Sequence, residues 1–433
     1  MRKVIRSVLP PLISLVIVML GNGFFNTFVS LRISIDGYAS WVIGIVNSSY
    51  FAGVMLGSIY VEKLLDRVGH IRTFAMFASI NSFIIIVQWL LLDPVSWVFL
   101  RFLTGVCAAG FFIVIESWLL LSTGVKSRGR LLSLYMLTLY MAQGGGQFIL
   151  NCSALSSFLP FAITIALNSL SVIPVCMIKS SGPLMLESSI TNLLHILYKA
   201  PLGPIGCFVA GLIMGSFYGL APIFGKESGL TLFQISQVMG FTILGGLVLQ
   251  WPIGHLSDIF NRRKVIIGIC LTLMVLTATL FCSYYFPYYV LLALMIIFGG
   301  ISFTLYPLSI TYTCDYFSEK NIIGITCSLL IIYGIGCIIG PLVAPLFMTV
   351  LGAKGLFSYM SILCAAYAFL AMSWRDPQPL KESEQSDYLP LPRATSLAFY
   401  LDPRSDVGDE EDEVEEYVHD RYPFDEEDEE EEE

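Results

Sequence analysis

The chain has 433 residues, of which 56% are hydrophobic and only 13% charged, whereas soluble domains contain about 25% charged residues. This composition excludes an ordinary soluble protein and indicates a protein that lies in a membrane. The net charge of −9 hides two opposite parts, because residues 1–375 carry a net +10 and residues 376–433 a net −19. The sequence therefore divides into a basic membrane part and an acidic tail.

Twelve stretches are apolar over about 20 residues, the length that a helix needs to cross ~30 Å of hydrocarbon. They lie near 8–31, 40–61, 73–92, 95–121, 131–149, 158–177, 204–223, 233–255, 265–285, 287–313, 322–347 and 355–373. The first run continues past its apolar start without a small-residue cleavage site, so we interpret it as an uncleaved span. The sequence predicts an all-α polytopic membrane protein.

The positive charges between the predicted spans indicate which side each loop faces. Loops on the amino-terminal side carry 17 Lys and Arg residues and the opposite loops carry 3. Because positive loops stay in the cytoplasm, we expect both termini there and the protein in the cell (inner) membrane. The domains predicted are 1–177, a linker 178–203, 204–375 and a tail 376–433. Leu186, Ile190 and Leu193 recur at helical spacing in the linker, which predicts an amphipathic helix at the membrane surface.

A repeat relates the two halves of the membrane part. The link Glu62–Arg72 aligns with the link Gly254–Lys264 at an offset of 192 residues, which places Asp66 on Asp258. The same offset carries the fourth span onto the tenth. Two halves in the same membrane orientation are typical of a transporter built by parallel duplication.

These links resemble the loop motif of the major facilitator superfamily, G-x-L-x-D-R-x-G-R-R. The first copy has Glu62 and His70 where the motif has Gly and a basic residue. R-F-L-T-G-V-C-A-A from Arg101 resembles the signature of that family's fourth span, and finer matches such as E-S-W-L from Glu116 are similar to an uncharacterised bacterial branch of transporters. The resemblance implies twelve helices in two pseudo-symmetric six-helix bundles, and transport of a small-molecule substrate by alternating access.

Arg101 and Glu116 are the two charged residues inside the predicted spans, both in the fourth. A charge in hydrocarbon is costly and usually faces a cavity or a partner. We expect Arg101, ~12 Å from the span's start at ~1.5 Å per residue, to bind substrate; the alternative is that it snorkels to the interface. For Glu116 we favour an ion pair at a cytoplasmic gate, with Arg128 and Arg130 as partners, over the carriage of a coupling proton.

Uncharged polar residues in the spans predict the lining of a substrate cavity, although hydrogen bonding between helices is the alternative for each. The candidates are Asn22, Asn26, Gln143, Gln147 and Tyr306. The resemblance implies gating roles, the making and breaking of helix contacts on the cytoplasmic face, for the two links and the entry to span five. The residues concerned are Asp66, Arg67, Gly69, Arg72, Arg128, Arg130, Gly254, Asp258, Arg262 and Arg263.

The tail ends in an entirely acidic run from Asp425 to Glu433, and this composition predicts disorder. Three roles fit it: binding of a basic protein partner, loosening of a closed gate, and a solvated appendage without a partner. We expect no cofactor, metal ion, nucleic acid or enzymatic activity, because the ten cysteines are scattered and the motifs of nucleotide, zinc-protease and serine-hydrolase sites do not occur. A monomer is expected. The rival function is a non-transporting membrane sensor that signals through the tail.

Overall fold

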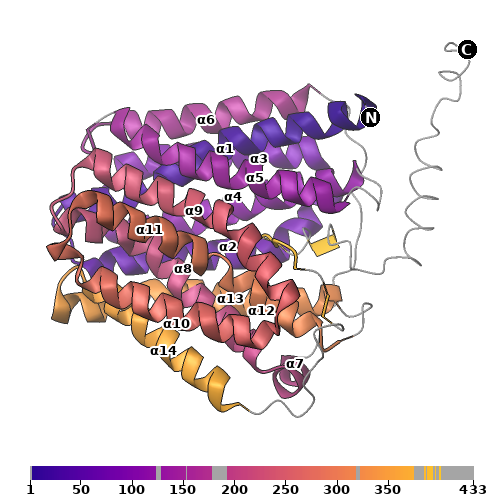
Figure 1. The fold of residues 1–433 in the computed structure, drawn as a ribbon. Coiled ribbons are helices and arrows are strands. Elements are labelled where there is room, and N and C mark those ends of the chain that lie inside the picture. The colour runs from indigo at the N-terminus through magenta and orange to yellow at the C-terminus, as the bar shows by residue number, and fades with distance from the viewer. Residues whose placement is uncertain are drawn as a thin grey trace, which may run out of the picture.

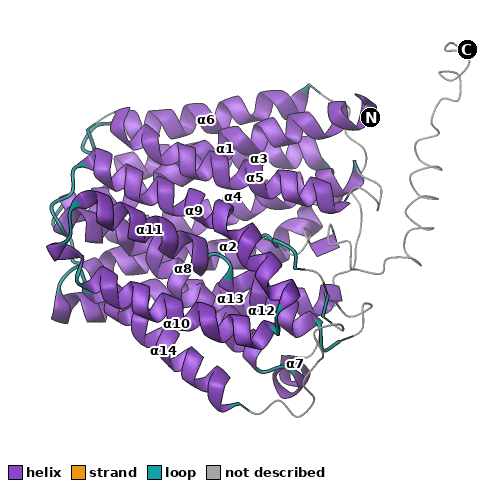
Figure 2. Ribbon diagram, viewed as in Figure 1, coloured by secondary structure: helices purple, strands orange, loops and turns teal. Residues whose placement is uncertain are grey.

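The computed structural model describes residues 2–122, 128–152, 154–177, 193–317, 322–374, 385–386, 388–393, 395 and 399–400. Over these ranges the regular structure is entirely helical (Figure 2), and the long helices run side by side along one common direction (Figure 1). The prediction of an all-α protein with pseudo-symmetric helical halves is confirmed.

The helices of the first half end at or before residue 177. They are α1 (Arg2–Ile35), α2 (Ser40–Val68), α3 (His70–Leu90), α4 (Pro94–Leu121), α5 (Arg128–Gly146) with the short η2 (Gln147–Cys152), and α6 (Leu159–Cys176). Those of the second half are α8 (Leu202–Glu227), α9 (Leu232–Ile259), α10 (Arg262–Phe281) with η3 (Ser283–Tyr285), α11 (Tyr288–Ser302), α12 (Leu305–Cys314), α13 (Ile322–Leu351) and α14 (Gly355–Ser373). Of the predicted linker helix, α7 (Leu193–Lys199) is described, whereas 178–192 lie outside the described residues.

Eleven helical segments of the described chain are long and apolar enough to cross a membrane, with α11 and α12 counted as one span. The predicted span 131–149 corresponds to α5 and η2, which is less apolar and is not among the eleven. It is nevertheless a helix packed between α1 and α9. Because protein neighbours surround it on two sides, this segment needs less apolar surface than a helix facing lipid.

The two repeated links are shorter than the sequence predicted, since helix continues through most of each. Helix α2 includes Asp66 and ends at Val68, and a single residue, Gly69 at φ +83°, separates it from α3. Helix α9 likewise continues to Ile259. A glycine suits the break at Gly69 because a side chain disfavours positive φ.

Helix α1 begins and helix α14 ends on one side of the bundle, which we call the terminal side (Figure 1). On the opposite side the two halves are in direct contact. A Cβ atom at Gly44 of α2 would lie 2.1 Å from the carbonyl oxygen of Pro341 in α13, so these two backbones touch. The Nζ atom of Lys226 donates to the Ser34 hydroxyl at 2.9 Å, joining α8 to α1. The halves are therefore closed together on the opposite side.

Candidate substrate site

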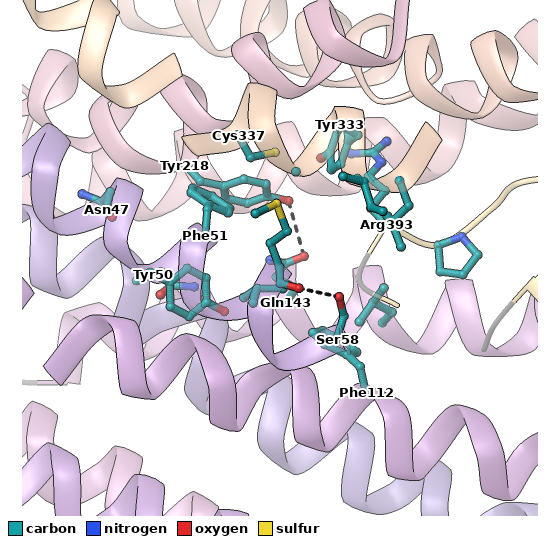
Figure 3. Close-up of a pocket in the computed structure, with 18 of the residues that line it drawn as sticks. Asn47, Tyr50, Phe51, Ser58, Phe112, Gln143, Tyr218, Tyr333, Cys337 and Arg393 are labelled. Atoms are coloured by element: carbon teal, nitrogen blue, oxygen red, sulfur yellow. Dashed lines mark hydrogen bonds between the residues drawn. The ribbon is translucent and has the colours of Figure 1, made fainter. Parts of the chain in front are cut away.

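A cavity of about 170 Å³ lies between the two halves (Figure 3). Helices α1, α2, α4 and α5 contribute its first-half wall, and α8 and α13 contribute its second-half wall. Its polar lining consists of Asn26, Asn47, Tyr50, Ser58, Arg101, Tyr140, Gln143, Tyr218, Tyr333, Cys337 and Arg393. A space bounded by both halves changes shape whenever one half moves against the other.

Arg101 is fully buried and lines this cavity, so it does not snorkel to the interface. One guanidinium nitrogen, Nη2, donates to Oδ1 of Asn26 at 2.5 Å, and the guanidinium carbon lies 4.3 Å from the centre of the Tyr50 ring. Among the residues that the structure describes, none accepts a hydrogen bond from the Nε and Nη1 atoms. Buried guanidinium donors are normally satisfied, so these two are available to a bound solute.

Close packing of α2 against α4 brings Tyr50 to Arg101. A Cβ atom at Gly53 would lie 2.0 Å from the Phe102 carbonyl oxygen, and one at Gly105 would lie 2.1 Å from the Tyr50 carbonyl oxygen. The space beside Gly105 is thus filled by the backbone of α2. Only glycine allows the backbones to approach this closely, so the two glycines position the cation–π pair.

Two of the predicted lining amides, Asn26 and Gln143, do line the cavity. The Gln143 Oε1 atom accepts a hydrogen bond from the Tyr218 hydroxyl at 3.4 Å, which links α5 to α8 across the two halves (Figure 3). Asn22 is half-buried on α1 and lies outside the lining. The polar lining therefore comes from fewer of the predicted residues than expected.

Gln147 and Tyr306 are also outside the lining. The Gln147 amide accepts from the Thr27 hydroxyl and donates to the Gly23 carbonyl oxygen, both at 2.7 Å, so it joins η2 to α1. Tyr306 is fully buried, and its ring centre lies 4.4 Å from that of Tyr333. Gln147 thus makes the helix-to-helix contacts that were the alternative for these residues.

Glu116 is fully buried near the terminal-side end of α4. Its Oε1 atom accepts from the Tyr135 hydroxyl at 2.5 Å, and its Oε2 atom accepts from the Thr395 hydroxyl. Of the expected arginine partners, Arg128 is half-buried and Arg130 is exposed. Tyr135 and Thr395 are partners that the sequence analysis did not identify.

The second repeated link forms an ionic cluster. Arg262 is almost fully buried, and its guanidinium contacts Asp258 at 3.3 Å and Asp315 at a shorter distance. Arg263 donates to the carbonyl oxygens of Ala371 and Trp374 at the end of α14. The cluster joins α9, α10 and α12 within the second half. Asp315 was not predicted; it follows a strongly apolar run, and only the fold places it beside Arg262.

The first copy of the link is more open to solvent. Asp66 is half-buried, whereas Arg67 and Arg72 are exposed. His70, at the position that aligns with Arg262, is buried and lies 3.0 Å from the Ser117 hydroxyl through its Nε2 atom. The two copies therefore differ in structure as they do in sequence.

Part of the acidic tail lies inside the bundle, which differs from the disorder expected for it. Leu391, Thr395, Phe399 and Tyr400 are buried, and Arg393 is among the residues that line the cavity. In Figure 1 the described tail residues (yellow) lie among the terminal-side ends of the helices. The acidic run 425–433 lies outside the described residues.

These features define a multi-pass helical membrane protein with an internal cavity between two halves. The profile of the Major Facilitator Superfamily matches residues 12–248 and 204–404. The chain belongs to the major facilitator superfamily of transporters, which are not enzymes.

Among curated relatives, the chain is 30% identical over 372 residues to an uncharacterised MFS-type transporter of Enterobacter sp. (strain 638), covering 86% of this chain and 96% of the relative. Among solved structures, it is similar to a mutant of the nucleoside transporter NupG, with a TM-score of 0.70, 14% identity and coverage of 85% of this chain and 99% of that one. It is also similar to a bacterial homologue of the human lysosomal transporter Spinster in an inward-facing, unoccupied conformation (TM-score 0.67, 12% identity, 84% and 96% covered). These structural similarities support the fold.

Proposed function

We propose that the protein carries a small solute across the cell inner membrane by alternating access, with Arg101 as the residue that binds the solute. The observation that carries this proposal is the buried guanidinium in a cavity between the halves, whose Nε and Nη1 atoms have no acceptor within the described part of the chain. Holding an unsatisfied buried charge is costly. A bound solute that supplies acceptors would remove that cost.

The geometry of Arg101 favours a solute with an anionic oxygen group. A guanidinium presents its N–H donors in one plane, and carboxylate or phosphate oxygens are strong acceptors for them. Nε and Nη1 lie on different edges of that plane, so each can donate to an oxygen of the solute. Asn26 and Tyr50 hold the plane in position from the other sides. The neighbouring Gln143 and Tyr218 supply uncharged polar groups to the rest of the solute.

Alternating access would separate the contacts on the opposite side and close the terminal side. Both termini are in the cytoplasm in this proposal, so the present conformation is closed to the outside. Glu116 is the candidate for a coupling proton, but its carboxylate instead joins the end of α4 to Tyr135 of α5 and to Thr395 of the tail. We therefore assign Glu116 to the gate and leave the driving force as either a proton elsewhere or the solute gradient itself.

The test is uptake of a metabolite mixture into proteoliposomes, followed by mass spectrometry of the lumen. Arg101→Ala should lower uptake of the transported solute roughly a hundredfold, as expected for removal of one partner of a buried charged contact. Arg101→Lys should retain part of it because the charge remains. Lys354→Ala, which removes an exposed cation from the opposite side, is the matched control.

Unchanged uptake in Arg101→Ala would contradict the assignment of Arg101. If the wild-type protein moves no solute under any gradient, the proposal of transport fails and the sensor function takes its place.

A further inference from the structure

The tail residues that lie in the bundle differ in composition from the rest of the tail. Between Gln385 and Tyr400 the sequence contains one acid, Asp387, and one base, Arg393, among prolines and apolar residues. We call residues 385–386, 388–393, 395 and 399–400, which the structure describes, the plug segment. It contacts the cavity, the gate residues of the second half and Glu116 of the first half.

Arg393 occupies a subsite built for a cation. Its guanidinium carbon lies 4.6 Å from the centre of the Phe303 ring, and Nη1 lies 3.4 Å from the Met214 sulfur. Tyr140, Tyr218 and Tyr333 line the same space. Aromatic faces attract a cation, more strongly when water is excluded. Among the described residues no carboxylate pairs with Arg393, so the aromatic rings and one carbonyl group hold it.

The Phe303 carbonyl lacks its usual backbone donor because of the sequence of α12. The Phe303 carbonyl oxygen would normally accept from the N–H four residues on, but that residue is Pro307, which has no N–H. The chain turns at this point between α11 and α12. The guanidinium of Arg393 donates to the Phe303 oxygen and satisfies it.

The second half anchors the plug segment through its gate cluster. The backbone N–H and the hydroxyl of Ser386 donate to Asp315 at 3.0 and 2.7 Å, and Arg262 donates to the Ser386 carbonyl at 2.6 Å. The Tyr388 N–H donates to Asp258 at 2.8 Å. The Tyr388 ring lies so close to the motif residue Gly254 that a Cβ atom there would be 2.2 Å from it.

The first half contributes Glu116, whose carboxylate accepts from the Thr395 hydroxyl. The plug segment thus contacts both halves on the terminal side. The cavity that remains has about 170 Å³, which is less than the roughly 300–1,000 Å³ of most ligand sites. The space between the halves is occupied.

We propose that the plug segment is a tethered occupant of the cavity, with Arg393 in the aromatic subsite, and that it must leave before a solute can reach Arg101 from the terminal side. The proposal rests on the proposed function in taking the cavity as the solute path. While the plug segment is bound, the terminal side cannot close, because tail atoms lie between the gate residues of the two halves. The tail therefore holds the transporter in its present conformation.

Cys337 provides a readout that does not depend on transport. It lines the cavity on α13, one turn beyond Tyr333 from the terminal side, and it is 2% exposed. The full-length protein is purified in detergent and treated with N-ethylmaleimide, and the modified peptides are quantified by mass spectrometry over time. Cys207, which is fully buried in α8, reports unfolding in the same sample.

Arg393→Ala should accelerate modification of Cys337 about tenfold. A buried thiol reacts only in the fraction of molecules in which the plug segment has left the cavity. That fraction rises when the desolvated cation–π contact of Arg393 is lost. Arg393→Lys should lie between Arg393→Ala and wild type, since the cation is kept. Arg404→Ala, which removes the same charge from the tail eleven residues further on, should match wild type. Cys207 should stay slow in every variant.

Equal Cys337 rates in Arg393→Ala, Arg404→Ala and wild type would overturn the proposal. If Arg393→Ala exposes Cys207 as well and so fails to fold, Thr395→Val, which removes the bond to Glu116, decides the question by the same measurement. Failure of the proposed function appears separately, as absent uptake, and leaves the labelling result intact.

Discussion

Substitution of Gly44 by alanine should drive the two halves apart on the opposite side. The new methyl group would lie 2.1 Å from the Pro341 carbonyl oxygen and 3.1 Å from Pro345 Cγ. A carbon and an oxygen approach to roughly 3.3 Å at closest, so α2 and α13 must separate by about 1 Å. Because the obstacle is backbone, no side-chain rotation relieves it.

The expected size of the shift in the conformational equilibrium follows from the cost of overpacking a tight interface, ~1–3 kcal/mol. This cost corresponds to about a 5- to 150-fold change in the ratio of the two conformations. Gly268→Ala is the matched control, because a Cβ atom at this exposed position of α10 meets nothing within 4 Å. Both are the same substitution in a helix. Only the one at the interface between the halves should change the conformational equilibrium.

The assay is the distance between spin labels on cysteines introduced at Tyr38 and Val350. Both positions are exposed on the opposite side, Tyr38 in the turn just before α2 and Val350 in the last turn of α13. The exposed Cys152, Cys176 and Cys282 are first replaced by serine so that they take no label. Gly44→Ala should add a population at longer distance, and Gly268→Ala should not. A distance distribution in Gly44→Ala that matches wild type would refute the account of this interface as the closed gate.

Three further substitutions test individual contacts. Asp258→Asn should slow turnover more than it weakens solute binding, since it loosens the cluster around Arg262; parallel flux and equilibrium-binding measurements that fall equally would contradict this. Glu116→Gln should impair cycling and leave binding nearly intact, and proton-driven accumulation that persists in full would exclude Glu116 as a proton carrier. Gln147→Leu should lower stability by ~1–3 kcal/mol, because the Thr27 hydroxyl and Gly23 carbonyl lose their partner; a lower melting temperature with unchanged solute affinity is the expected pair of results.

Much of the fold follows from local properties of the sequence. Apolar runs of about 20 residues predict spans, because the cost of exposing backbone polar groups in hydrocarbon forces them into helices. Arg101 is recognisable for the same reason, as a charge that hydrocarbon does not tolerate. The ends of the helices are less predictable: Asp66 and Asp258 belong to helices because water at the membrane surface accommodates charged side chains on a continuing helix.

The neighbours of a polar residue depend on the tertiary fold and are not visible in the sequence. Gln143 and Gln147 lie one turn apart on the same segment, yet the first faces the cavity and the second bonds to α1. Nothing in their local sequence distinguishes them. The plug segment has a detectable signal, an apolar, proline-containing stretch within an acidic tail, but its partners Phe303 and Asp315 come from distant parts of the chain.

The differences between the two repeated links explain why the tail binds where it does. At the offset of 192 residues, Arg262 and Asp315 of the second half correspond to His70 and Thr123 of the first. The second half alone therefore has, at these positions, a buried guanidinium between two carboxylates with acceptors left for a peptide. Ser386 and the Tyr388 N–H bind those acceptors. A gate cluster that joins three helices of one half thereby also serves as the anchor for a segment that keeps the two halves apart.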